Sequence, residues 1–147
     1  MSSTDVMDEV TLTLTRHFDA PRQRVYEAWS QAEFIAQWFG PDDMSVPECT
    51  FEATPGAAYR IVMQGGDGNQ HVVHGVVREV SPPDRLAYSW AWEGQDWDSE
   101  VTLEFADDGD GTMLTLTHAK LPSQGAADSH KGGWTSSFVS LDRLLAA

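Results

Sequence analysis

The C-terminal stretch of the chain, residues 123–147, constrains the fold most strongly. Its large apolar residues recur at spacings of four, three and four: Trp134, Phe138, Leu141 and Leu145. This is the pattern of one apolar helical face, with Ser123 placed to cap its start and Arg143 to complement the helix dipole in the last turn. A helix of this kind gains most of its stability by burying that face. The rest of the chain must therefore offer a large apolar surface.

Upstream of this helix, apolar residues alternate with polar ones, as they do in half-buried strands. The alternation predicts strands over residues 10–18, 71–80, 85–93, 100–106 and 112–120, with two more around Phe51 and around 59–63. Glycine, proline, aspartate and asparagine gather between these segments and predict the turns of an antiparallel meander. The sheet is thus expected to be built from strands that follow one another along the chain.

Two short helices are expected after the first strand. Asp19 is a candidate cap and Pro21 fits a first helical turn. A second helix over residues 31–37 ends at the corner formed by Phe39, Gly40 and Pro41. A large sheet twists and curls, so a long helix on its concave face leaves a tapering space, which is either core or cavity.

Composition narrows the class of protein. With 41% hydrophobic residues in 147, the chain should fold as one domain over residues 10–147, preceded by a frayed leader over residues 1–9. The net charge of −14 would repel nucleic acids and anionic membranes, although solubility, or a salty or GC-rich source, is the more common reason for such a charge. Cys49 is the single cysteine, and no apolar run approaches the length of a membrane span. We expect a cytoplasmic protein with no membrane insertion.

Five segments carry a resemblance to a known family. In order, they are RHFDAPRQRVYEAWSQAEFIAQWFGP, a Pro-Gly turn before AYRIVMQGGDG, then REVSPPDRLAYSW, TLTH and HKGGWTSSFVSLDRLL. Together they resemble the activator of heat-shock-protein-90 ATPase homologue-like family of the START-like, birch-pollen-allergen-related (SRPBCC) superfamily. The resemblance implies an α+β helix-grip fold, a curved antiparallel sheet of about six to seven strands around the long C-terminal helix. It also implies that Trp38, Phe39 and Pro41 lie near a cavity mouth and that Trp134 faces the sheet.

Aromatic side chains, one methionine and two histidines form the predicted ligand-binding set. Its members are Trp38, Phe39, Tyr59, Met63, Tyr88, Trp90, Trp92, His118, His130, Trp134 and Phe138. Such side chains pack as core or line a pocket. With the fold resemblance, we expect a flat or apolar ligand to lie between Trp90 and Trp92 on the sheet and Trp134 on the helix. The adjacent Gly132 and Gly133 either allow close packing of helix on sheet, or leave room or a gate for a ligand.

The histidines raise the questions of metal binding and of proton transfer. His71 and His74 point to opposite faces of one strand, and no histidine pair has a metal-binding spacing, so neither a metal nor a cofactor is expected. His118 is inward by parity with Leu114 and Leu116, and His130 lies one turn before Trp134. Both are candidate hydrogen-bond donors or general bases, or simply structural residues. No nucleophile or phosphate-loop motif is present, so the catalytic residues of any enzyme remain unknown.

Three functions remain open. The first is binding of a small apolar or aromatic molecule in the cavity. The second is a cavity enzyme of the polyketide cyclase or aromatase type, to which the superfamily resemblance also points. The third is a chaperone-interacting stress-response protein, whose mark would be an exposed apolar patch. A homodimer is compatible with each of them.

Overall fold

The computed structural model describes residues 10–40, 44–95 and 97–146. The predicted leader over residues 1–9 lies outside them. The elements are β1 (Val10–Phe18), α1 (Arg22–Ser30), α2 (Ala32–Trp38), β2 (Ser45–Thr50), β3 (Ala58–Gln64), β4 (Gln70–Ser81), β5 (Arg85–Trp92), β6 (Ser99–Asp108), β7 (Gly111–Leu121) and α3 (Gln124–Ala146).

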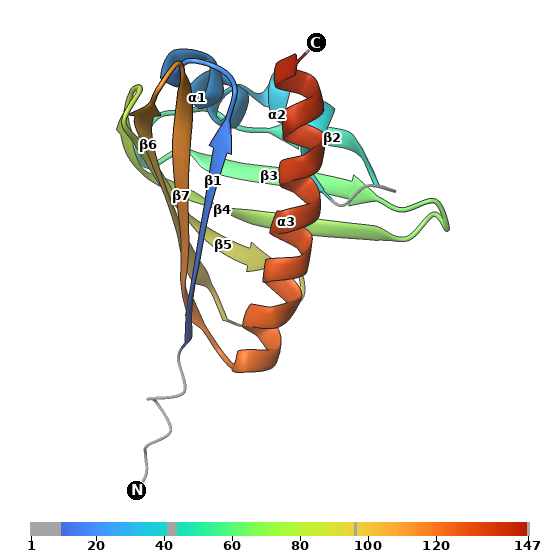
Figure 1. Cartoon of the computed structure of the whole chain (residues 1–147). Coiled ribbons are helices and arrows are strands. Elements are labelled where there is room, and N and C mark those ends of the chain that lie inside the picture. Colours follow the sequence, from blue (N-terminus) through green and yellow to red (C-terminus); the bar gives the residue numbers. More distant parts are fainter. Residues whose placement is uncertain (1–9, 41–43, 96, 147) are drawn as a thin grey trace, which may run out of the picture.

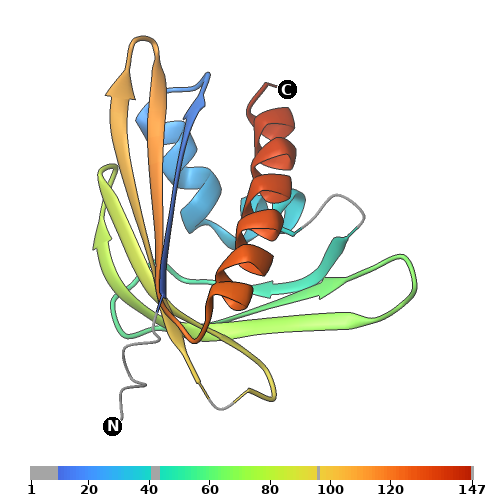
Figure 2. The same cartoon turned by 60° about the horizontal axis from the view of Figure 1, so that its bottom comes forward.

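The strands form one seven-stranded antiparallel sheet in the order β1-β7-β6-β5-β4-β3-β2. The sheet bends strongly, and α3 runs across its concave side, with α1 and α2 covering one end of the space between them (Figure 1; Figure 2). The predicted α+β helix-grip fold is therefore confirmed. None of the helices in the described part of the chain has an apolar stretch suited to crossing a bilayer.

Helix α3 is held at both ends. Ser123 caps its start, because its Oγ accepts a hydrogen bond from the Ala126 N–H at 3.1 Å. At the other end the Arg24 guanidinium donates to the Leu145 carbonyl at 2.6 Å, satisfying an oxygen that has no partner within the helix. An ion pair between Arg16 of β1 and Asp142 of α3 also holds this end of the helix in place. The predicted apolar face is buried as expected: Trp134, Phe138, Leu141 and Leu145 are each at most 5% exposed.

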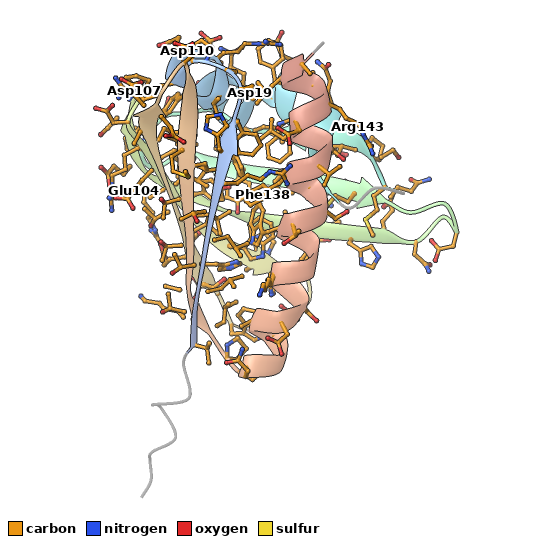
Figure 3. The ribbon with its side chains drawn as sticks, in the orientation of Figure 1. Asp19, Glu104, Asp107, Asp110, Phe138 and Arg143 are labelled. Atoms are coloured by element: carbon orange, nitrogen blue, oxygen red, sulfur yellow. The ribbon has the colours of Figure 1, made fainter. Side chains whose placement is uncertain are left out.

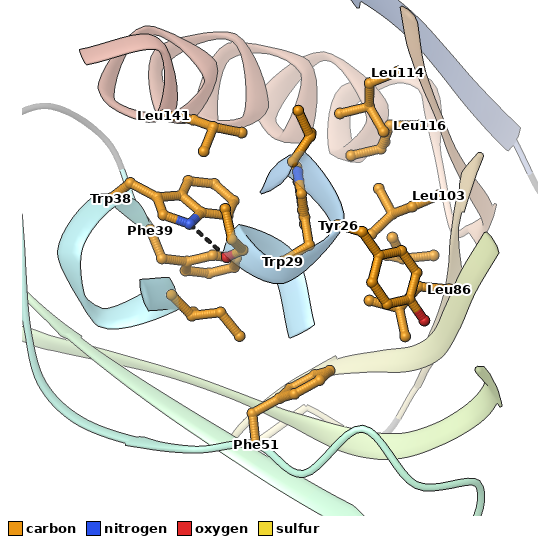
Figure 4. Packing of buried hydrophobic residues seen from close by; sticks show 14 of the residues in the cluster. Tyr26, Trp29, Trp38, Phe39, Phe51, Leu86, Leu103, Leu114, Leu116 and Leu141 are labelled. Atoms are coloured by element: carbon orange, nitrogen blue, oxygen red, sulfur yellow. Dashed lines mark hydrogen bonds between the residues drawn. The ribbon is translucent and has the colours of Figure 1, made fainter. Parts of the chain in front are cut away.

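The core at the α1 end is densely aromatic. The rings of Trp29 and Trp38 lie 4.5 Å apart, and the Trp38 indole N–H donates to the Ala28 carbonyl at 2.9 Å (Figure 4). This hydrogen bond fixes the angle between α1 and α2 and so positions the following Phe39. Phe138 points from α3 toward the sheet (Figure 3), where it packs edge-on against Phe18 at 5.9 Å.

Acidic side chains gather at the same end of the molecule, among them Asp19, Asp107 and Asp110 (Figure 3). The structure differs here from the sequence-based prediction that Asp19 caps α1. The N-cap is Pro21, and no side chain caps the helix. The Asp19 carboxylate instead lies 2.8 Å from His17 Nε2. An imidazole two residues away offers Asp19 a closer partner than the helix start does.

Gly75 in β4 allows an unusually close approach of β5. A Cβ at this position would lie 2.2 Å from the Ser89 carbonyl oxygen, which itself accepts a hydrogen bond from the Tyr59 hydroxyl at 2.6 Å. We expect Gly75→Ala to lower the free energy of unfolding by about 2–4 kcal/mol, through overpacking and loss of that hydrogen bond. Urea unfolding followed by tryptophan fluorescence measures the change.

Gly66→Ala is the control, because a Cβ there meets nothing within 4 Å. It should change the free energy of unfolding by less than about 0.5 kcal/mol. Equal stability of the two variants would contradict this account of Gly75.

Candidate ligand-binding cavity

A cavity of about 250 Å³ lies between the first half of α3 and strands β3 to β5. Phe39, Gly40 and Met44, which lie between α2 and β2, close one side of it. The lining residues come from all these elements: Phe39, Gly40, Met44, Met63, His71, Trp90, Trp92, Ser129, His130, Gly133, Trp134 and Ser137. His71 and Ser129 are exposed, whereas Trp90, Trp134 and Ser137 are buried. The cavity therefore has a rim that meets solvent and a buried interior.

Three aromatic rings make one continuous wall. Trp90 and Trp134 have centroids 5.0 Å apart, and Phe39 lies 5.9 Å from each of them. A flat molecule sandwiched between two rings needs them about 7 Å apart, twice the contact distance of carbon atoms. The predicted position of a ligand between Trp90 and Trp134 does not fit this geometry. The space of the cavity lies beside both rings, against their common surface.

A chain of hydrogen bonds runs behind this wall. The Trp134 indole N–H donates to His118 Nδ1 at 3.2 Å, His118 Nε2 lies 2.7 Å from Ser99 Oγ, and Ser99 Oγ donates to the Trp90 carbonyl at 3.0 Å. The Ser99 hydroxyl donates its one proton to the Trp90 carbonyl, so its oxygen accepts the hydrogen bond from His118. The proton in that second bond is therefore carried by His118 Nε2. His118 is fully buried, and burial lowers its pKa to about 3, with a smaller effect from His130. His118 is thus a neutral structural link that does not border the cavity.

His130, like His118, has a hydrogen-bond partner at each of its two ring nitrogens. Its Nδ1 lies 2.7 Å from the Ala126 carbonyl, to which it donates, and its Nε2 accepts the Trp92 indole N–H at 3.1 Å. The imidazole therefore clamps Trp92 of β5 to α3 at the side of the cavity. Both histidines predicted as proton carriers have both ring nitrogens occupied, which leaves neither with a free lone pair for general base catalysis.

The predicted binding residues divide into two groups. Those that line the cavity are Phe39, Met63, Trp90, Trp92, His130 and Trp134. Those that lie elsewhere are Trp38, Tyr59, Tyr88, His118 and Phe138, which pack on Trp29, Phe51, Tyr59, Trp90 and Phe18, respectively. The two tyrosine rings are 5.2 Å apart, and burial raises the pKa of both hydroxyls. This second group belongs to the packed core and to the link behind the wall.

Six lining residues were absent from the predicted binding set: Gly40, Met44, His71, Ser129, Gly133 and Ser137. Ser129, Gly133 and Ser137 follow one another at a spacing of four, beside the His130 and Trp134 stripe, so helical periodicity could have identified them. A Cβ at Gly132 or Gly133 would meet nothing within 4 Å. Close packing of helix on sheet is therefore the wrong explanation for the glycine pair, and Gly133 leaves room in the cavity.

No three potential metal-ligating side chains come together in residues 10–40, 44–95 and 97–146. The polar groups of the cavity suit hydrogen bonding to an organic molecule.

A bent antiparallel sheet closed by a C-terminal helix, with an apolar cavity between them, defines a helix-grip protein of the START-like class. Residues 19–146 match the family model described as Activator of Hsp90 ATPase homolog 1-like protein, and the chain belongs to this family. A comparison with functionally curated proteins gave no match.

Solved structures share the whole fold. The AHSA1 protein from Silicibacter pomeroyi is 29% identical over 93% of this chain and 98% of its own, with a TM-score of 0.86. Protein CV1439 from Chromobacterium violaceum also has a TM-score of 0.86, at 24% identity over 93% of this chain and 97% of its own. DynU16, a protein in the dynemicin biosynthetic locus, is 25% identical over 93% of this chain and 47% of its own, with a TM-score of 0.77.

The neutral state of His118 makes stability depend on pH. We expect its imidazole to remain the Nε2–H tautomer, without titrating, from pH 8 to about pH 4, as measured by nitrogen-15 NMR of the histidine rings. An unfolded histidine titrates near 6.5, so the contribution of His118 to stability is complete above about pH 6.5. It is lost as the pH falls from there toward 3, by about 1.4 kcal/mol per pH unit.

His118→Gln keeps a hydrogen-bonding side chain but cannot titrate. The free energy of unfolding of this variant should lack that part of the pH dependence. A His118 titration midpoint near 6.5 in the folded protein would contradict the assignment.

Proposed function

We propose that the protein binds a small, mostly apolar or aromatic molecule in the cavity beneath α3. The observation that carries the proposal is an aromatic-walled space of about 250 Å³, open at one rim, within the fold of this family. A buried apolar cavity of about 150 Å³ already accommodates benzene. The enclosed space suits about two rings, a third ring can extend through the open rim, and burial of apolar surface would provide the affinity.

The neighbouring structures support a role with small molecules. DynU16 shares the fold and belongs to a biosynthetic locus. That setting agrees with a cavity built to hold an organic compound. The class of compound proposed here is argued from the cavity and not from that neighbour.

The geometry favours binding over the two other hypotheses. For a cyclase or aromatase, the candidate proton carriers His118 and His130 have no free nitrogen. For a chaperone partner, an apolar docking patch is expected, yet Val139, at 38% exposure, is the single large apolar side chain classed as exposed in the part of the chain that the structure describes. Binding in the cavity needs neither feature.

The glycine pair provides a matched test. Gly133 lines the cavity and Gly132, its neighbour, does not, although a side chain would meet open space at both. We expect Gly133→Leu to fill the cavity and abolish binding of N-phenyl-1-naphthylamine, an uncharged aromatic probe whose fluorescence rises in apolar pockets. Gly132→Leu should bind within about twofold of the wild type. Both variants should be stabilised by up to about 1 kcal/mol, because leucine is the better helix former.

Because both variants keep the fold, lost binding in one of them reports on the cavity. Saturable binding of the probe that survives in Gly133→Leu would refute the proposed site. A wild-type protein that shows no saturable binding of such probes would refute the function.

A further inference from the structure

The Ser137 hydroxyl is the most unusual polar group of the cavity. The residue is 4% exposed, lines the cavity and lies one turn after Gly133 on α3. Within the described residues its hydroxyl makes no hydrogen bond. The Ser137 oxygen is not among the buried side-chain atoms that lack a partner, so part of its surface stays accessible although the residue as a whole is buried. The hydroxyl is therefore available to a molecule inside the cavity.

The other polar groups of the interior are already committed. His130 uses both ring nitrogens, and the Trp92 indole N–H is donated to it. At the rim, His71 and Ser129 are exposed and can bind water. The Trp90 indole N–H, on the same wall as Trp134, is also buried without an acceptor among the described residues. The Trp90 N–H has almost no accessible surface, so the hydrogen-bonding group left over deep in the cavity is the Ser137 hydroxyl.

Charge adds a second restriction on the ligand. None of the described residues that line the cavity is Asp, Glu, Lys or Arg. A buried ion without a partner is strongly disfavoured, and the net charge of −14 further disfavours anions. Among the described residues of the lining, a carboxylate, phosphate or ammonium group would find no counter-charge.

We infer that the ligand is a neutral, flat aromatic molecule with a hydroxyl or carbonyl group at its inner end, hydrogen-bonded to Ser137 Oγ. This inference rests on the proposed binding function. The ligand enters at the rim formed by His71 and Ser129 and lies along the small residues of α3. Ser129 and Ser137 are eight residues apart, about 12 Å along a helix, which matches a molecule of two fused rings with one polar substituent.

Three probes of one shape test the inference: naphthalene, 2-naphthol and 2-naphthoate. Affinities are measured from the shifts of the tryptophan indole N–H signals in nitrogen-15 NMR, because the probes absorb where tryptophan does. The wild type should bind 2-naphthol about 2- to 12-fold more tightly than naphthalene, the gain of one hydrogen bond, and 2-naphthoate more weakly than either. In Ser137→Ala the preference for 2-naphthol should disappear, while naphthalene binds within about twofold of the wild type.

Ser140→Ala is the matched control, since it removes a hydroxyl from the same helix at a residue that does not line this cavity. It should keep the full preference for 2-naphthol. Equal binding of naphthalene and 2-naphthol to the wild type, or equal losses for both in Ser137→Ala, would overturn the inference and leave cavity binding intact. If neither binds although N-phenyl-1-naphthylamine does, the inference is also overturned. If that probe fails as well, the proposed function itself falls.

Discussion

The chain of hydrogen bonds from Trp134 through His118 and Ser99 to the Trp90 carbonyl ties α3 to three strands at once. It works only with a neutral imidazole, which accepts at one nitrogen and donates at the other. Burial keeps the imidazole neutral, because the protonated form would lose its hydration inside the protein. The orientation of Trp134 is fixed as a result, and with it the aromatic wall that it shares with Trp90. The cavity is thereby formed before any ligand arrives.

One helix performs two tasks that usually exclude each other. The second half of α3 buries Phe138, Leu141 and Leu145 and completes the core near α1. The first half carries Gly133, which gives up helix propensity and leaves space in the cavity instead. Stability and an open interior are thus separated along a single element. This separation allows the protein to keep a rigid scaffold around a space that packing alone would have filled.

The sequence predicted the fold well because strand and helix faces follow from local spacing. The period of two in β5 correctly placed Tyr88 and Trp90 inward, and helical spacing did the same for Trp134 and Phe138. Spacing gives the face of a residue but not its depth or its neighbours, so it could not separate Trp90, on the cavity, from Tyr88, in the core. Ser137 was missed for a different reason, since its spacing of four from Gly133 does indicate the cavity face but its side chain gives no apolar signal. A serine within a helix has the same pattern as the solvent-exposed face unless the tertiary partner is known.

The absence of a side chain at position 133 also has a consequence for how this family can diversify. Alanine, valine or leucine there would shorten the guest that the protein accepts by roughly one carbon at a time, without disturbing the sheet or the histidine behind the wall. Selectivity could then drift through changes at a single codon while the rest of the architecture is inherited unchanged. Under the proposed function, the size of the side chain at position 133 would set the length of the ligand that this protein accepts.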